Sequence, residues 1–190
     1  KALRDVDLDN SAFKGVEAII QSMTPFERNN PHVINGSRRK RIADSKRIGN
    51  PGCHASGFIA LIYPLVEKGI LDKNALLSCF SLTGYSGGGK KMIADYESDE
   101  KGEALFAPSH YALNGDHKHI PEMQIICGLE KKPVFNPIVD DYYKGMEVAV
   151  PLHKEFLNGF TVEQIHDMLY TYYRNTCNVS VNPELVQEGK

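Results

Sequence analysis

The chain has 190 residues, of which 42% are hydrophobic and 24% are charged, the composition of a globular domain. Its net charge of −2 disfavours a protein that binds nucleic acid through charge alone, and no apolar run approaches the roughly 18–20 residues of a membrane span. No signal peptide is recognisable and no CxxC spacing occurs, so we expect reduced thiols and a cytoplasmic protein. The first residue is Lys1, and we expect the chain to be a piece of a longer protein.

Residues 1–47 form the least regular part of the sequence. Apolar residues recur at helical spacing within residues 11–23, and prolines and asparagines interrupt the pattern after that. Six basic residues follow in residues 37–47. A nucleic-acid-binding arm is one interpretation, but a solvated helix face or loop is favoured, because no aromatic residue is interleaved with the charges.

Regular patterns begin at residue 48. We predict helices over residues 54–68, 90–96, 121–127 and 161–174, strands over residues 76–83, 134–139 and 146–152, a glycine loop at 84–89 and irregular chain at 105–113. Thr161 is the expected N-cap of the last helix, and Gln164 completes a capping box. Strands interspersed with helices, several joined without a crossover, predict an α/β or α+β fold with a mixed sheet.

Cys53 is the first candidate for chemistry. Asn50, Pro51 and Gly52 predict a tight turn immediately before it, so Cys53 falls where the next helix begins. Free amides and the helix dipole favour an anion there and would stabilise a thiolate, the nucleophilic form of cysteine. A small core residue is the alternative, and it is the favoured interpretation of the other three cysteines, Cys79, Cys127 and Cys177.

A second candidate is the His117-Lys118-His119 segment. Residues two apart on extended chain project to the same face, so both imidazoles could line one pocket. His119 lies ahead of Pro121 and is expected to be extended, at the mouth of the helix that follows. The positive end of that helix would favour neutral imidazole, which can act as a general base. Two exposed loop histidines are the alternative, and His-x-His followed by Glu122 also resembles the spacing of metal ligands, although no further ligand is recognisable.

The third candidate is the glycine-rich segment 83–91. It satisfies Gly-x4-Gly-Lys between a strand and a helix, but Lys91 stands where a phosphate loop needs serine or threonine for magnesium. A nucleotide triphosphatase is therefore disfavoured. Consecutive glycines still let backbone amides approach an anion, and Lys90 can supply positive charge, which suits a phosphorylated substrate or a cofactor phosphate. A flexible hairpin loop is the alternative.

Taken in order, these three segments resemble the family of N-acetyl-gamma-glutamyl-phosphate reductases, in its shorter form. The segments 135–137, 144–146 and 150–153 extend the resemblance, which covers about residues 42–155. It implies an α+β (α/β-like) fold with a mixed, largely antiparallel sheet and helices on one face, similar to the C-terminal domain of glyceraldehyde-3-phosphate dehydrogenase. It also implies the NADPH-dependent reduction of N-acetyl-glutamyl 5-phosphate to the 5-semialdehyde through a cysteine thioester.

The resemblance also implies residue roles. Cys53 would attack the acyl phosphate and His119 would be the general acid/base. Five residues would bind substrate: Asn50, Ser86, Lys90, His117 and Lys144. Gly87 and Gly88 would lie near the cofactor, and no metal is implied.

The resemblance leaves parts of the chain unmatched. No Gly-x-Gly-x-x-Gly turn follows an N-terminal strand, so we expect residues 1–47 to be a poorly matched segment, residues 48–190 to be the catalytic and dimerisation domain, and the Rossmann domain that would hold most of the NADPH to be absent. A homodimer or homotetramer is expected. Two alternatives stay open: a non-catalytic subunit-interaction domain, and a related reductase for a longer or carrier-bound acyl phosphate.

Overall fold

The computed structural model describes residues 52–175 and 179–184. The predicted helix at 11–23, the basic residues at 37–47, Asn50 and Cys177 lie outside these ranges.

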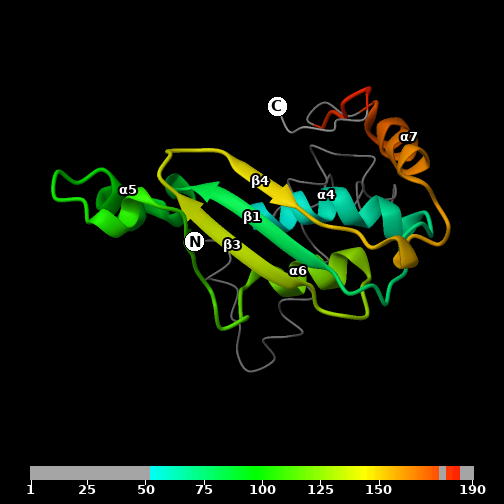
Figure 1. Cartoon of the computed structure of the whole chain (residues 1–190), viewed down its shortest axis with the longest axis horizontal. Coiled ribbons are helices and arrows are strands. Elements are labelled where there is room, and N and C mark those ends of the chain that lie inside the picture. The colour runs from blue at the N-terminus through cyan, green and yellow to red at the C-terminus, as the bar shows by residue number, and fades with distance from the viewer. Residues whose placement is uncertain (1–51, 176–178, 185–190) are drawn as a thin grey trace, which may run out of the picture.

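Four helices and four strands make up the described part of the chain (Figure 1). The helices are α4 (Cys53–Glu67), α5 (Gly89–Tyr96), α6 (His119–Cys127) and α7 (Val162–Tyr173), and the strands are β1 (Ser78–Gly84), β2 (Ser109–His110), β3 (Val134–Asp140) and β4 (Met146–Ala149). Three short 3₁₀ turns lie between them: η1 (Tyr85–Gly88), η2 (Glu103–Phe106) and η3 (Lys154–Phe156). Each predicted helix and strand between residues 54 and 174 is present, with ends that differ by a few residues.

The strands form one mixed sheet in the order β2-β3-β1-β4. The two central strands, β1 and β3, run parallel, from the Ser78–Val134 pair to the Gly84–Asp140 pair. The outer strands β4 and β2 pair antiparallel with β1 and β3 respectively. The predicted α+β fold with a mixed sheet is confirmed, and two of its three pairings are antiparallel.

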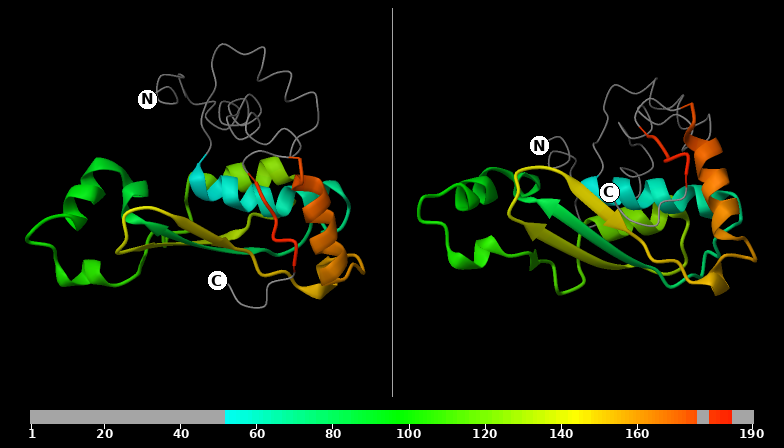
Figure 2. Two further views of the ribbon diagram at one scale, coloured as in Figure 1. Left: turned by 90° about the horizontal axis from the view of Figure 1, so that it is seen from above. Right: turned by 45° about the horizontal axis from the view of Figure 1, so that its top comes forward.

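Helices α4 and α6 lie side by side over one face of this sheet (Figure 2), and α7 packs against α4. The core between the helices and the sheet contains Phe58, Ile62, Met123 and Cys79, each no more than 1% exposed. Along β1 the burial alternates, because successive side chains of a strand point to opposite faces. Phe80 consequently lies on the open face, where it is 43% exposed.

Several local predictions were wrong in detail. The predicted irregular stretch 105–113 contains the end of η2 and the two-residue strand β2, and the predicted glycine loop contains the 3₁₀ turn η1. The last strand ends at Ala149 rather than at residue 152, before Pro151, which has no backbone N–H to donate to a neighbouring strand. The capping box at Thr161 and Gln164 is confirmed in both of its hydrogen bonds.

The prediction that His119 is extended was also wrong, because His119 is the first residue of α6. Pro121 is then the third residue of the helix. A first-turn amide has no carbonyl partner within the helix, so the missing N–H of Pro121 costs no hydrogen bond there.

Among residues 52–175 and 179–184, no helix is both long enough and apolar enough to cross a membrane.

Candidate active site

Cys53 is the first residue of α4 and its side chain is exposed, as the sequence predicts for a reactive thiol. The other two described cysteines are buried. Burial raises the pKa of Cys79 to about 12 and also raises the pKa of Cys127, because a low-dielectric interior disfavours the thiolate. Both behave as the small core residues expected, and Cys53 is the accessible thiol among these three.

The first turns of α4 and α6 meet on the side of the sheet where the parallel strands β1 and β3 end (Figure 2). The backbone amide of Gly52, the N-cap of α4, donates a hydrogen bond of 2.8 Å to Oε2 of Glu122 on α6. This amide is therefore not free for an anion, contrary to the expectation for this helix end. The carboxylate instead stabilises the positive end of α4 from the neighbouring helix.

His119 lies directly against the residue that precedes Cys53. A Cβ atom built on Gly52 would overlap Cδ2 and Nε2 of the His119 ring, so only glycine fits at this position. His119 is 4% exposed. Burial, followed by the charges of His117, His54 and Lys118, lowers its pKa to about 3, which favours the neutral ring at pH 7. A neutral ring was predicted, but from the helix dipole rather than from burial. Its Nδ1 is buried without a hydrogen-bond partner in the described part of the chain.

His117 lies beside His119, with their ring centroids 4.5 Å apart. The Nδ1 atom of His117 accepts a hydrogen bond of 3.2 Å from the backbone amide of His119, which leaves the proton of a neutral ring on Nε2. Burial and the charge of Lys118 lower the pKa of His117. The structure thus brings His117, His119 and the Cys53 end of α4 together, as the sequence predicts.

His54 belongs to the same group of side chains but is not among the predicted site residues. It is 3% exposed, its ring centroid lies 5.4 Å from that of His119, and it makes two short hydrogen bonds. Its Nδ1 lies 2.6 Å from the hydroxyl oxygen of Ser81, and its Nε2 lies 2.7 Å from the hydroxyl of Tyr111. Burial and the charge of His117 lower the pKa of His54 to about 4.

Two sequence signals could have identified this group. His54, Phe58 and Ile62 recur every four residues, which places the histidine on the buried face of α4. A buried histidine needs hydrogen-bond partners. Ser81 is a polar residue at an inward position of an apolar strand, where it can supply one.

The glycine-rich segment lies beyond the same end of the sheet. The backbone amides of Tyr85 and Ser86 donate to the carbonyls of Tyr142 and Tyr143, so η1 and the loop before β4 are held together. This contact brings Ser86 close to Lys144, two of the residues that the resemblance assigns to substrate. Three further predicted residues of this segment, Gly87, Gly88 and Lys90, are exposed.

The described residues do not form a dinucleotide-binding site. In such a site the helix after the glycine turn packs on the sheet and leads directly to the next parallel strand. Here α5 has eight residues and packs against η1, and the chain reaches β3 only after η2, β2 and α6. Gly87 and Gly88 are exposed beyond this end of the sheet, and their contact with a cofactor stays a prediction.

His117, His119 and Glu122 also have a spacing that resembles that of metal ligands. Within residues 52–175 and 179–184, no group of three or more His, Cys, Asp and Glu side chains is arranged to hold a metal ion. The carboxylate of Glu122 accepts from the Gly52 amide, and Nδ1 of His117 accepts from the His119 amide.

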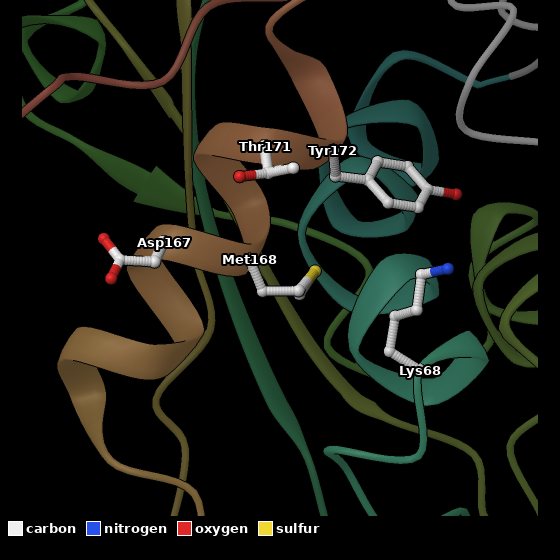
Figure 3. Close-up of a pocket in the computed structure, with 5 residues that line it drawn as sticks. All are labelled: Lys68, Asp167, Met168, Thr171 and Tyr172. Atoms are coloured by element: carbon white, nitrogen blue, oxygen red, sulfur yellow. The ribbon is translucent and has the colours of Figure 1, made fainter.

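A cavity of about 440 Å³ lies elsewhere, between the end of α4 and α7 (Figure 3). It is lined by Lys68, Asp167, Met168, Thr171 and Tyr172. The Lys68 ammonium lies 5.9 Å from the centre of the Tyr172 ring. The sequence predicts no catalytic or binding role for any of these residues. The candidate site is therefore the one that contains the Cys53 thiol, His117 and His119.

The site and fold agree with a comparison against family models. Residues 53–188 match the family described as "Semialdehyde dehydrogenase, dimerisation domain". The chain therefore belongs to this family over that range.

Curated relatives over the same part of the chain carry the name N-acetyl-gamma-glutamyl-phosphate reductase. The protein from Rhizobium meliloti (strain 1021) is 43% identical over 152 residues, which cover 79% of this chain and 49% of the relative. The protein from Sinorhizobium medicae (strain WSM419) is 42% identical over 152 residues, which also cover 79% of this chain and 49% of the relative. One from Rhizobium etli (strain ATCC 51251) is 39% identical over 173 residues, 87% of this chain and 56% of the relative. The chain spans about half the length of these relatives.

Residues 1–45 match a different family model, described as "Signal peptide binding domain". This match covers most of the poorly matched segment 1–47, including four of the six basic residues at 37–47. The two family matches meet between residues 45 and 53, close to the boundary at residue 47 expected from the sequence.

Proposed function

We propose that residues 53–188 perform the acyl-transfer half of the N-acetyl-gamma-glutamyl-phosphate reductase reaction, in the cytoplasm, with Cys53 as the nucleophile. The observation that carries this proposal is the position of the Cys53 thiol. It is exposed at the start of α4, one residue after Gly52, against which the ring of His119 lies. The names of the relatives support the choice of acyl phosphate.

In the proposed step, the sulfur of Cys53 forms a bond to the acyl carbon of N-acetyl-glutamyl 5-phosphate. The bond between that carbon and the phosphate oxygen breaks, and phosphate leaves with the electron pair. The thiol proton passes to His119, whose neutral ring can accept it. A thiolate is both a good nucleophile and a good leaving group, so a thioester is a suitable intermediate.

Substrate contacts are proposed for the residues that the resemblance assigns to this role. His117 lies in the same group of rings as His119 and can donate from Nε2. Lys90 and Lys144 are exposed cations close to the glycine turn, where they can attract the phosphate or a substrate carboxylate. Ser86 and Asn50 complete the proposed set.

Reduction of the thioester needs NADPH, which we propose is bound mainly outside the described residues. The glycines of η1 are exposed, and we propose that their backbone amides contact a phosphate group of the cofactor. The described residues are therefore proposed to form the thioester but not to reduce it.

Mass spectrometry of the chain after reaction with N-acetyl-glutamyl 5-phosphate tests this function. We expect an acyl group on the peptide that contains Cys53, removable with hydroxylamine, and no acylation of that peptide in Cys53→Ala. His119→Gln should slow acylation at least about 100-fold, the lower end of the ordinary contribution of general-base catalysis. Acetyl phosphate serves as the control substrate.

Iodoacetamide provides a second measurement. We expect Cys53 to react far faster than the other three thiols near neutral pH, and phosphate or substrate to slow it. Equal labelling of all four cysteines, or acylation spread evenly among them, would contradict the proposed function.

A subunit-interaction role is the second candidate, and the open face of the sheet supports it. A groove of about 340 Å³ on this face is lined mainly by apolar side chains, with Phe80, Leu82, Pro108, Ile138, Glu147 and Ala149 around it. We propose that a second copy of the chain covers the groove, since the matching family is described as a dimerisation domain. Light scattering that shows a dimer without any acylation of Cys53 would favour this role alone.

A further inference from the structure

One edge of β3 is only partly covered by β2. The amide of Val134 donates to the carbonyl of Leu77, on the β1 side of the strand. The carbonyl of Pro137 accepts from the amide of Tyr111, on the β2 side. Backbone groups of successive residues in a strand point alternately to its two neighbours, so those of Phe135 point to the same side as those of Pro137. The N–H and C=O of Phe135 therefore face the β2 edge.

The chain leaves this edge before it reaches Phe135. The antiparallel register of β2 on β3, if continued, would place Leu113 opposite Phe135. The chain turns instead at Ala112, whose φ of 52° lies in the left-handed region that residues with a side chain seldom adopt. The Ala112 carbonyl accepts from the amide of Gly115 at 3.1 Å, and Leu113 is 83% exposed. Among the described residues, no backbone group takes the place of Leu113 on Phe135.

A cavity of about 330 Å³ lies at the uncovered edge. It is bounded by residues 110–115, by residues 132–137 and by Ile120 of α6. Phe135 is only 7% exposed, and an unpaired backbone amide in so buried a residue is unfavourable unless a polar group enters to bind it. Lys132 is the one permanently charged side chain among the described residues that line the cavity.

Two prolines limit what can bind at this edge. Pro133 and Pro137 flank Phe135 on the same side of β3, and neither has a backbone N–H. A strand added here would find a donor only at Phe135, so prolines at these positions disfavour a continuous strand. One donor and one acceptor on a single residue are sufficient for one amide.

We propose that this cavity binds an N-acylated amino acid. The amide N–H of the ligand donates to the Phe135 carbonyl and its α-carboxylate accepts from the Phe135 amide, the two bonds that an opposite residue of an antiparallel strand makes. Lys132 attracts the carboxylate. The acyl group packs on the apolar part of the wall, which includes Ile120. A free amino acid fits less well, because its ammonium group would lie near Lys132.

This cavity is separate from the candidate active site. Cys53, His117 and His119 are not among the residues that line it. The two sites share a wall, since the Phe135 ring centroid lies 5.0 Å from that of His117. Binding in the cavity does not need a reactive Cys53, so the inference goes beyond the proposed function and does not depend on it.

Nuclear magnetic resonance of the full chain, with ¹⁵N in phenylalanine and ¹³C in the valine carbonyls, tests the proposal. Val134–Phe135 is the sole Val-Phe pair in the sequence, so the Phe135 amide is identified without a substitution. The probe is N-acetyl-L-alanine, which has no second carboxyl group to resemble the acyl phosphate. We expect the Phe135 amide proton to move downfield and the shift to saturate.

Two neighbouring lysines provide matched variants. Lys132→Glu should weaken binding at least about tenfold, because it reverses the charge beside the carboxylate. Lys131→Glu changes an exposed lysine that does not line the cavity, and its affinity should stay within about twofold of the original chain. L-alanine and the methyl ester of N-acetyl-L-alanine should each bind at least about tenfold more weakly than the probe. Circular dichroism establishes that both variants are folded.

Several outcomes would overturn the inference. One is a Phe135 resonance that the probe does not move, and another is equal weakening by the two lysine variants. Tighter binding of a trialanine peptide would show that the edge takes a strand, and a Phe135 shift that follows chain concentration without probe would show that a second copy fills the cavity. Loss of binding in Cys53→Ala would contradict a separate site. Saturable binding by a chain that no acyl phosphate modifies would support the inference and contradict the proposed function.

Discussion

Gly52 and His119 are packed so closely that no side chain fits between them. The imidazole lies where a Cβ of residue 52 would be, and the amide of Gly52 donates to Glu122, three residues further along α6. Two contacts from one turn of α6 therefore fix the residue that precedes Cys53. The position of the thiol relative to the histidines depends on a residue with no side chain.

Gly52→Ala should displace the His119 ring. Overpacking of a buried site typically costs about 1–3 kcal/mol, so we expect a loss of that size in the free energy of unfolding, measured in urea. Acylation of Cys53 by acyl phosphate should slow at least tenfold, because the proposed base moves.

Gly102→Ala is the matched control for this change. A Cβ at Gly102 meets no atom within 4 Å, and its φ of −66° suits any residue. Its stability and acylation rate should match those of the original chain. A similar effect of both substitutions would contradict a specific role for the Gly52–His119 contact.

The buried histidines should make the protein less stable in acid. In the unfolded chain His54 and His119 bind protons near their ordinary pKa of 6.5, whereas in the folded chain they do so only near 4 and 3. The unfolded state therefore binds more protons between pH 6.5 and 3. The contribution of the two neutral histidines to the free energy of unfolding is therefore complete above pH 6.5. It falls as the pH decreases, by at most about 1.4 kcal/mol per pH unit for each histidine.

Urea unfolding at pH 7.5, 6.0 and 5.0 measures this dependence. His119→Gln should show a smaller slope than the original chain, whereas His110→Gln, at an exposed residue, should keep the slope. The raised pKa of Glu122 acts in the opposite direction, because the folded state binds a proton first when the pH falls toward 4.5. An original chain whose stability does not change from pH 7.5 to 5.0 would contradict the burial of neutral histidines.

Glu122 should stabilise the start of α4 through one hydrogen bond. Glu122→Ala leaves the Gly52 amide without its acceptor, and we expect a loss of about 1–3 kcal/mol in the free energy of unfolding. Glu122→Gln retains an acceptor and removes a charge whose burial is unfavourable, so its loss should be smaller. Glu130→Ala, at an exposed side chain, is the control, and an equal loss in both alanine variants would contradict the proposed contact.

The main elements of the fold could be predicted because their signals are local. Apolar periodicity predicted α4, and an apolar run predicted β1. The α7 capping box needs only residues three apart, Thr161 and Gln164, and it was found correctly. The two-residue strand β2 has no such signal, since it exists only through its pairing with β3.

Part of the candidate site could also be predicted, because some of its signals lie within a few neighbouring residues. A turn before Cys53 and a pair of histidines two residues apart are visible in the sequence. The contact of Tyr111 with His54 joins residues 57 positions apart, and the carboxylate of Glu122 reaches Gly52 across 70 positions. Such contacts follow from how α4, α6 and β1 pack, and no local pattern encodes them.

The open face of the sheet provides the last prediction. Phe80 is 43% exposed at the groove beside Leu82 and Ile138, and a second copy would bury it. Phe80→Arg places a charge in that apolar interface, so the mass measured by light scattering should fall to that of one chain. Leu113→Arg changes a side chain that is 83% exposed and does not line the groove, and it should leave the assembly intact. An unchanged mass for Phe80→Arg would mean that copies of the chain associate through another surface.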